Sequence, residues 1–380
     1  MSTDRRDRPV DPKKVDRLLA RVRREVDEGL SPAVSIAIAR DGDVLVDATV
    51  GAPHGSRFCG FSSTKALVAA ATWRMIDQGE IDIDRAAADY VPEFGTNGKD
   101  VVTVEQLLTH TGGFPWAPLG PDRWATPEGR REAFSRWRLT LEPGESFVYH
   151  PTAGHWVLGE ILGVVTGGDH ASAIEELVTA PLGLPRLLGI PVDEQDDIVD
   201  VEGVGAQPTP EEMEAAFGVK IDLAQLVPPD VALGALLTLN APEARAVGVP
   251  GGGGIFRARD LARFYQGLLH DPAGLWSPEV LAAGTRDVRM RLPDVWGVPA
   301  SRALGLVVAG DDGLADRRGF GRTASPRAFG HNGAGGQIVF ADPDTGLSVA
   351  YLTAALDQHM IREGKRTIAV ASLAADLLLD

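Results

Sequence analysis

Ser62 and Lys65 stand three residues apart and are of the types that form a nucleophile and its base. They bound the only Ser-x-x-Lys of the sequence, and the apolar stretch 63–79 that follows predicts a helix buried all round. Residues i and i+3 share a helix face, so the hydroxyl and the amine can meet. Burial lowers the pKa of a lysine, and a neutral amine can activate a serine. The alternative is that Ser62 caps the helix and Lys65 reaches solvent.

Tyr149 is the second candidate, one of only four tyrosines in the chain. It ends the run Pro-Gly-Glu-Ser-Phe-Val-Tyr, in which a turn is followed by a short extended segment. A phenol close to an ammonium is stabilised as phenolate and can accept the serine proton. The alternative is a half-buried tyrosine whose hydroxyl bonds to the backbone.

The third candidate is the glycine-rich segment 330–336, Gly-His-Asn-Gly-Ala-Gly-Gly, directly before a predicted strand. Glycines there let a ligand or another chain approach the backbone closely. An N–H of this strand opposite the N–H of Ser62 would supply two donors to a developing oxyanion. A simple glycine-rich turn is the alternative.

In this order the three segments resemble the superfamily of penicillin-binding proteins, class C-like serine β-lactamases and related carboxylesterases. The superfamily pattern is Ser-x-x-Lys, then a tyrosine motif, then Lys/His-x-Gly on a strand. The resemblance covers roughly residues 31–356. It is supported by the stretches 107–114 (Leu-Leu-Thr-His-Thr-Gly-Gly-Phe), 143–149, 252–254 followed by 258–261, and 330–343.

The resemblance implies that Ser62 is the nucleophile, that Lys65 and Tyr149 form the general-base pair, and that the N–H groups of Ser62 and Ala334 form the oxyanion hole. It implies neither a metal ion nor an organic cofactor. Further candidates to contact the substrate are His331, Gly333, Gln337, His150 and Trp116. Trp116 lies with Trp124 and Trp137 in an irregular segment that either lines an apolar acyl pocket or simply packs.

Two departures favour the esterase branch, the family VIII carboxylesterases. Pro151 stands where β-lactamase-like members carry an asparagine that holds the substrate amide, and His331 replaces a lysine. Histidine is mostly neutral at pH 7, so a substrate carboxylate would be held less strongly there. We therefore expect hydrolysis of small-molecule carboxylic esters through a Ser62 acyl-enzyme. The alternatives are an acyltransferase, a β-lactamase or D-amino-acid peptidase, and a ligand-binding module without catalysis.

The elements that must position these residues follow from periodicity. A β-hairpin with an Asp-Gly turn is predicted at 33–50, and a short strand at 57–60. The expected fold is α+β: an antiparallel sheet flanked by helices, formed by residues 1–80 and 250–380, with an inserted all-helical or mainly helical region at 81–249. Lid-like loops are expected at 115–145 and 185–250. The remaining predicted elements are helices at 11–29, 258–269 and 361–379 and strands at 304–309, 337–341 and 347–353.

Composition narrows the partners. The chain has 380 residues, 44% hydrophobic, enough for a large core, and a formal net charge of −16 that disfavours nucleic acid and anionic membranes. Its single cysteine, Cys59, allows no intrachain disulfide. We see no secretory signal and no apolar run of roughly 18 residues, so the expected location is cytoplasmic. The oligomeric state stays open.

Overall fold

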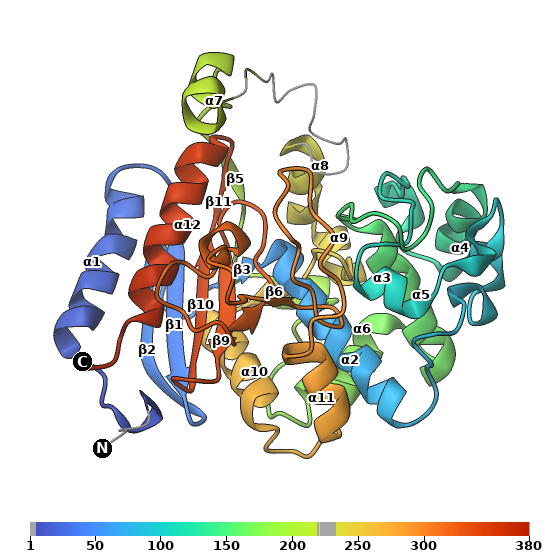
Figure 1. Ribbon diagram of the computed structural model, residues 1–380, viewed down its shortest axis with the longest axis horizontal. Helices are drawn as coiled ribbons and strands as arrows, with labels where there is room; N and C mark the ends of the chain where they lie inside the picture. Colours follow the sequence, from blue (N-terminus) through green and yellow to red (C-terminus); the bar gives the residue numbers. More distant parts are fainter. Residues whose placement is uncertain (1–4, 219, 221–232, 380) are drawn as a thin grey trace.

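The centre of the fold is a six-stranded antiparallel sheet built from both ends of the chain (Figure 1). The computed structural model describes residues 5–218, 220 and 233–379. The strands of the sheet lie in the order β2-β1-β10-β9-β8-β7, as expected for an α+β fold. Their bounds are β1 (Val34–Arg40), β2 (Asp43–Val50), β7 (Val307–Val308), β8 (Phe329–Gly330), β9 (Ile338–Asp342) and β10 (Leu347–Thr353).

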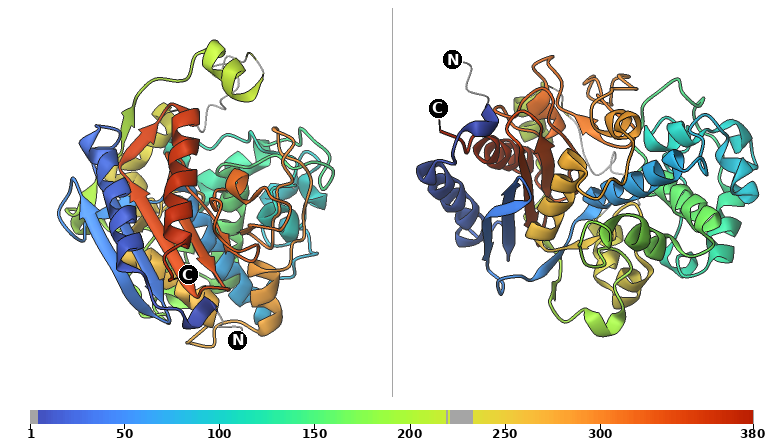
Figure 2. Two further views of the ribbon diagram at one scale, coloured as in Figure 1. Left: turned by 60° about the vertical axis from the view of Figure 1, so that its left-hand side comes forward. Right: turned by 90° about the horizontal axis from the view of Figure 1, so that it is seen from below.

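Both faces of the sheet are covered by helices. Successive side chains of β1 point to opposite faces, and the apolar side chains on each face belong to a separate core cluster. Val34, Ile36 and Ile38 pack with α1 (Pro12–Asp27) and α12 (Met360–Ala375), which Figures 1 and 2 show side by side. The alanines between them face α10 (Ala258–His270). The predicted hairpin is present, with Asp41 and Gly42 in its turn at φ 54° and 86°.

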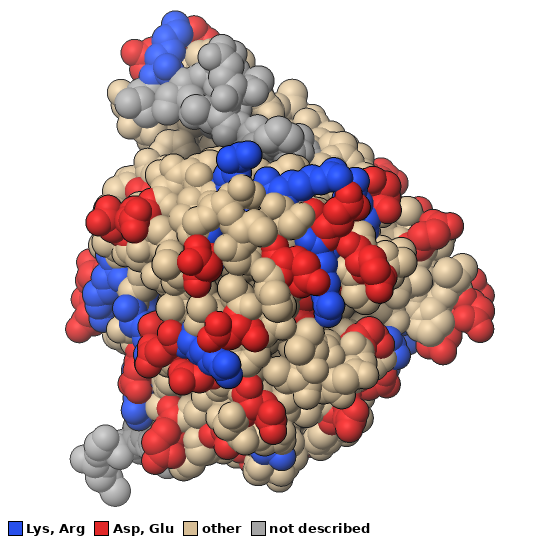
Figure 3. All heavy atoms as spheres, turned by 90° about the vertical axis from the view of Figure 1, so that its right-hand side faces the viewer, with Lys and Arg blue, Asp and Glu red and all other residues tan. Residues whose placement is uncertain are grey.

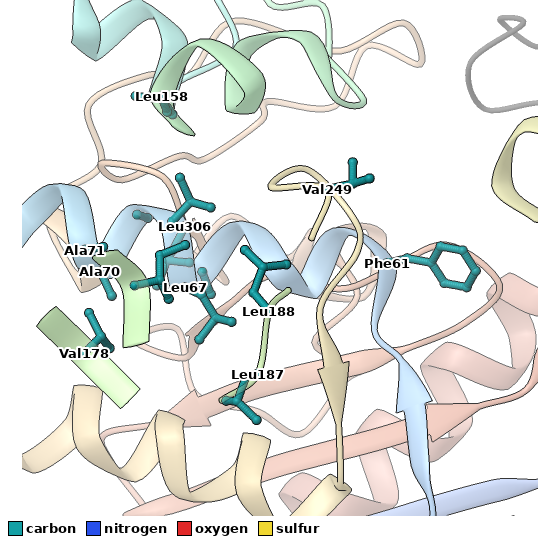
Figure 4. Close-up of a cluster of buried hydrophobic side chains, with 14 of the residues drawn as sticks. Phe61, Leu67, Ala70, Ala71, Leu158, Val178, Leu187, Leu188, Val249 and Leu306 are labelled. Atoms are coloured by element: carbon teal, nitrogen blue, oxygen red, sulfur yellow. The ribbon is translucent and has the colours of Figure 1, made fainter. Parts of the chain in front are cut away.

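The helix α2 (Lys65–Asp77) is buried along most of its length. Its sequence offers no polar face, and the side chains from Lys65 to Trp73 are all buried. Figure 4 shows Leu67, Ala70 and Ala71 of this helix among the side chains of the surrounding elements. Trp73 Nε1 donates to the carbonyl of Leu304 at 2.8 Å, which ties the helix to the segment before β7.

Helices predominate over strands in residues 81–249, and two short strands of this segment pair with strands outside it. Strand β4 (Ile198–Val199) runs parallel to β3 (Arg57–Cys59), and β5 (Glu202–Val204) runs parallel to β11 (Ala355–Asp357). The sequence did not indicate these strands because each is only two or three residues long. Strand β6 (Ile255–Phe256) also pairs with β3. The remaining helices are α3 (Val104–Leu108), α4 (Pro127–Arg136), α5 (Ala153–Thr166), α6 (His170–Ile174), α7 (Pro210–Phe217), α8 (Leu233–Leu237), α9 (Pro242–Val247) and α11 (Pro278–Thr285).

One predicted strand is shorter than expected. The segment 304–309 becomes extended only at β7, because Gly305 has φ 100° and packs against Ala69 of α2. A β-carbon at Gly305 would approach the Ala69 side chain to 2.7 Å. None of the helices in residues 5–218, 220 and 233–379 combines the length and the hydropathy of a membrane-spanning segment.

A buried ion network joins the terminal helices to the turn between β8 and β9. Arg366 of α12 contacts the carboxylates of Glu25 and Asp357, each at 3.2 Å. Its other terminal nitrogen donates to the carbonyl of Gly335 at 2.9 Å. The network therefore fixes a turn that carries Ala334.

Replacing Arg366 by methionine removes the cation that lies between two buried carboxylates, so that Glu25 keeps only its pair with Arg21 and Asp357 only its pair with Arg362. We expect Arg366→Met to lower the free energy of unfolding by about 3 kcal/mol. Urea denaturation followed by circular dichroism measures the loss. Arg24→Met, which breaks an exposed pair with Glu28, is the control and should change stability by less than about 0.5 kcal/mol. Equal effects of the two substitutions would contradict the role given to the network.

Candidate active site

Ser62 lies in a 3₁₀ turn, Phe61–Thr64, between strand β3 and helix α2. The turn is tight: Phe61 has φ 45°, a left-handed conformation that is costly for a bulky residue. Thr64 secures the turn, because its hydroxyl donates to the Phe61 carbonyl at 2.6 Å and accepts from the Gly254 N–H at 2.8 Å. Ser62 is thus held in a rigid turn directly before α2, and its side chain does not cap the helix.

Lys65 is fully buried and contacts Ser62 directly. Its Nζ lies 3.1 Å from Ser62 Oγ and donates to the carbonyl oxygens of Pro151 and Gly251, both at 2.6 Å. This geometry excludes the alternative in which the lysine reaches solvent. The two carbonyls come from the loop before α5 and from the glycine run before β6, so three separate parts of the chain meet at one amine.

The carbonyls can only accept hydrogen bonds, and this fixes what the amine can do. As an ammonium, Lys65 donates to both carbonyls and to Ser62 Oγ. As a neutral amine, it donates its two protons to the carbonyls and turns its lone pair toward Ser62. The Lys65 amine can therefore keep the same position, with the same three neighbouring oxygens, before and after it takes a proton.

Tyr149 lies beside both residues. Lys65 Nζ is 5.1 Å from the centre of its ring. Burial raises the pKa of the Tyr149 phenol, and the Arg302 charge and a hydrogen bond with Ser62 oppose that effect. With a raised pKa, the resting tyrosine is a neutral phenol at pH 7, in contact with the serine hydroxyl.

The turn Gly333–Gln337 brings Ala334 to the same place. Gly333 packs directly on the backbone carbonyl of Gly60, where a β-carbon would overlap the oxygen, so the turn lies against the segment that leads to Ser62. Gly335 and Gly336 have φ 76° and 95°, conformations that favour glycine. Ser62 and Ala334 line one pocket, as two donors of an oxyanion hole must.

That pocket has a volume of about 620 Å³ and mainly apolar walls. The 118–121 loop and Trp124 line the pocket, and so do residues of α8 and of the segment that follows it. Both predicted lid-like segments thus contribute, although residues 221–232 of the second lie outside the described residues. Further lining residues are Phe61, Phe147, Pro151, Gly251, Val298, Arg302 and His331.

Comparison with known proteins identifies the family. Residues 18–373 match the model of the beta-lactamase family. The chain belongs to the beta-lactamase family. It is 27% identical over 328 residues to the esterase/beta-lactamase LipL of Mycobacterium tuberculosis, which covers 76% of this chain and 67% of LipL.

Two crystal structures have the same fold over nearly the whole chain. A penicillin-binding protein homologue from Caulobacter crescentus has a TM-score of 0.77 at 27% identity, covering 96% of this chain and 99% of that one. A family VIII carboxylesterase has a TM-score of 0.74 at 26% identity, with coverages of 96% and 99%. These matches confirm the predicted family, its fold and the expectation of a serine hydrolase.

His331 lines the pocket, as expected from the sequence. Its Nδ1 lies 2.9 Å from the Asn332 carbonyl. Burial holds the pKa of His331 well below its usual value, and the nearby charges of Arg302 and Lys65 lower it further. The imidazole is therefore neutral at pH 7 and offers no charge to a substrate carboxylate.

Four predicted substrate-contacting residues do not line this pocket. Gly333 and Gln337 are structural: Gln337 is fully buried and its side-chain amide bonds to the backbone of Thr353. His150 is buried between the Phe114 N–H and the Val148 carbonyl. Trp116 is half exposed and lines a separate hollow. The sequence pattern predicted which segments lie near the site, but it did not predict which of their residues face the pocket.

A cluster of buried histidines lies behind Tyr149. The rings of His150 and His155 are 5.9 Å and 5.6 Å from that of His110, which is 4.5 Å from the tyrosine ring. Burial lowers the pKa of each, that of His150 to about 4. Among the described residues, neither ring nitrogen of His155 has a hydrogen-bond partner.

Arg302 is the site residue that the sequence analysis missed. It is buried, and its guanidinium carbon lies 5.5 Å from the centre of the Tyr149 ring and 5.4 Å from that of Phe147. Burial lowers the pKa of Arg302 to about 10, so it stays charged at pH 7. It belongs to no recognisable motif, and only the fold brings it to the pocket. Within the described residues, no group of three His, Cys, Asp or Glu side chains is placed to hold a metal ion.

The neutral histidines make stability depend on pH. In the unfolded chain they bind protons near pH 6.5, whereas the folded protein binds them only at lower pH. The unfolded state therefore takes up more protons in that window, and the free energy of unfolding falls as the pH drops from 7 toward 4. Replacing His155 by phenylalanine should flatten this decline by up to about 1.4 kcal/mol per pH unit.

Urea denaturation at pH 7, 6 and 5 measures the effect. His54→Gln, at an exposed histidine, serves as the control and should keep the slope of the parent protein. A His155→Phe slope equal to that of the parent would contradict a histidine that is neutral because it is buried.

Proposed function

We propose that the protein is a serine carboxylesterase that acts on small-molecule esters through an acyl-enzyme at Ser62. One observation carries the proposal: Ser62 Oγ lies 3.1 Å from a buried lysine whose two further acceptors are fixed carbonyls. An amine held in this way can take the serine proton without moving.

Acylation begins when Ser62 Oγ attacks the ester carbonyl. The serine proton passes to Lys65, either directly or by way of Tyr149, and the Oγ–carbon bond forms as the carbonyl π electrons move to oxygen. Because Tyr149 rests as a neutral phenol, it accepts that proton only by passing its own to Lys65. The two residues thus act as one base.

The negative oxygen of the tetrahedral intermediate is stabilised by the N–H groups of Ser62 and Ala334. The intermediate collapses when Tyr149 or Lys65 returns the proton to the leaving alcohol. Water then attacks the acyl-enzyme by the same route, with the base pair taking a proton from water and returning it to Ser62 Oγ. The products are the carboxylic acid and the free enzyme.

The departures at Pro151 and His331 support an ester rather than a β-lactam or a peptide. Pro151 supplies a carbonyl to Lys65 but no side-chain amide to hold a substrate amide. His331 is neutral, and its Nδ1 contacts the backbone carbonyl of Asn332. The similarity to LipL and to a family VIII carboxylesterase points in the same direction.

Hydrolysis of p-nitrophenyl butyrate tests the proposal. Ser62→Ala should lower kcat by about 10⁴-fold or more, because the nucleophile and its proton route are lost together. Ser63→Ala is a matched control: this neighbour lies in the same turn, is fully buried and bonds to no described residue through its hydroxyl. It should keep kcat within a few-fold of the parent.

The same preparation separates the other reactions of this chemistry. The ester should have a higher kcat/KM than a chromogenic cephalosporin, and water should be the main acyl acceptor when a short alcohol is added. Unchanged esterase activity in Ser62→Ala, or faster turnover of the cephalosporin, would overturn the assignment. Failure of a fluorophosphonate to label Ser62 would favour a module that only binds ligands.

A further inference from the structure

We propose that Arg302 binds a carboxylate carried by the substrate, so that the enzyme prefers esters that bear a second, anionic group. This inference rests on the proposed esterase function and names the substrate class of the same pocket. It concerns specificity, since no step of the acyl transfer is assigned to Arg302.

The first support is that Arg302 is a buried cation with no anion beside it. Its side chain is 6% exposed, and Nε and Nη1 have no hydrogen-bond partner among the described residues. No carboxylate of the described chain forms an ion pair with it either. Its guanidinium carbon lies 5.4 Å from the centre of the Phe147 ring and 5.5 Å from that of Tyr149, and a cation–π contact supplies only part of what a guanidinium loses on leaving water.

The second support is the position of the guanidinium. Arg302 lines the pocket that contains Ser62. Its guanidinium carbon and Lys65 Nζ both lie within 5.5 Å of the same Tyr149 ring centre. A substrate whose carbonyl meets Ser62 can therefore reach Arg302 with a group a few bonds away. A guanidinium binds a carboxylate through two parallel hydrogen bonds, which also orients the ligand.

The third support is the charge of the pocket wall. Although the chain carries a formal net charge of −16, three arginines line this pocket against one acid, Asp294. Asp294 already accepts hydrogen bonds from the N–H groups of Trp296 and Val298. The outer surface differs, with acidic and basic side chains interspersed on the face in Figure 3. The pocket is thus locally cationic and suited to an anion. Its arginines are Arg302, Arg317 and Arg318, of which Arg318 pairs with Asp312.

A different role for Arg302 would act on the tyrosine alone. Its charge opposes the rise of the Tyr149 pKa. If that were its whole function, removing it would slow neutral and anionic esters by the same factor. The ratio of kcat/KM between two matched esters therefore separates the two roles.

Two matched pairs test the proposal. Monomethyl glutarate and methyl valerate differ by a carboxylate in place of a methyl group on the acyl side, with methanol release followed by NMR. The 4-acetoxy-3-nitrobenzoate and 2-nitrophenyl acetate pair differs by a carboxylate on the leaving group. In the parent protein the anionic member of at least one pair should have the higher kcat/KM. Arg302→Gln should lower that anionic-to-neutral ratio by about 10- to 100-fold, the loss expected for a charged hydrogen bond.

Controls keep the test specific. Arg286→Gln removes one positive charge at a fully exposed site, and it should leave the ratio as in the parent. Arg302→Lys keeps the charge and should recover part of the ratio. A ratio unchanged in Arg302→Gln for both pairs, or changed equally in Arg286→Gln, would overturn the proposal. Thermal denaturation of each variant shows whether it is folded.

A binding measurement separates this proposal from the esterase assignment. In the Ser62→Ala background, the dissociation constant of monomethyl glutarate is compared with and without Arg302→Gln. We expect Arg302→Gln to raise it about tenfold or more, whether or not the parent protein hydrolyses any ester. Equal affinity of Ser62→Ala and of the Ser62→Ala/Arg302→Gln double variant would contradict a carboxylate site at Arg302. Absence of esterase activity in the parent protein would contradict only the proposed function.

Discussion

The rest of the structure depends on the burial of one amine. A lysine without exposed surface is stable only if its protons meet acceptors, and Lys65 finds acceptors in Ser62 Oγ and the carbonyls of Pro151 and Gly251. These atoms belong to segments far apart in the sequence. Gly251 can approach because it has no side chain: a β-carbon there would meet the Thr152 backbone at 2.8 Å. The candidate site is therefore complete only when these segments are packed together.

The turn Gly333–Gln337, which carries the proposed oxyanion donor Ala334, is held by a second buried charge. Arg366 donates to the Gly335 carbonyl while it pairs with Glu25 and Asp357, so helices α1 and α12 support the turn that carries Ala334. Gly333 fixes the turn at a second point, because it packs directly on the Gly60 carbonyl. Two rigid supports fix the distance between the turn and the serine, and a hole of backbone donors requires that rigidity.

Much of this was predictable from the sequence where local pattern determines structure. The hairpin at 33–50, the strand β10 and the all-round burial of α2 follow from turn residues and periodicity. The order of Ser62, Tyr149 and the glycine segment predicted which residues gather. Side-chain direction was not predictable, as Trp116 and Gln337 show. Arg302 was missed because only a tertiary contact, after the left-handed turn of Ser301 at φ 49°, brings it to the pocket.

The central claim is that Ser62 carries the acyl group during turnover. Acid quenching during hydrolysis of a slow ester, followed by mass spectrometry of the intact protein and of its peptides, tests this most directly. We predict a protein heavier by one acyl group, with the added mass on the peptide that contains Ser62 and on its hydroxyl. An acyl group on another residue, or continued turnover with no covalent adduct at any quench time, would contradict the account.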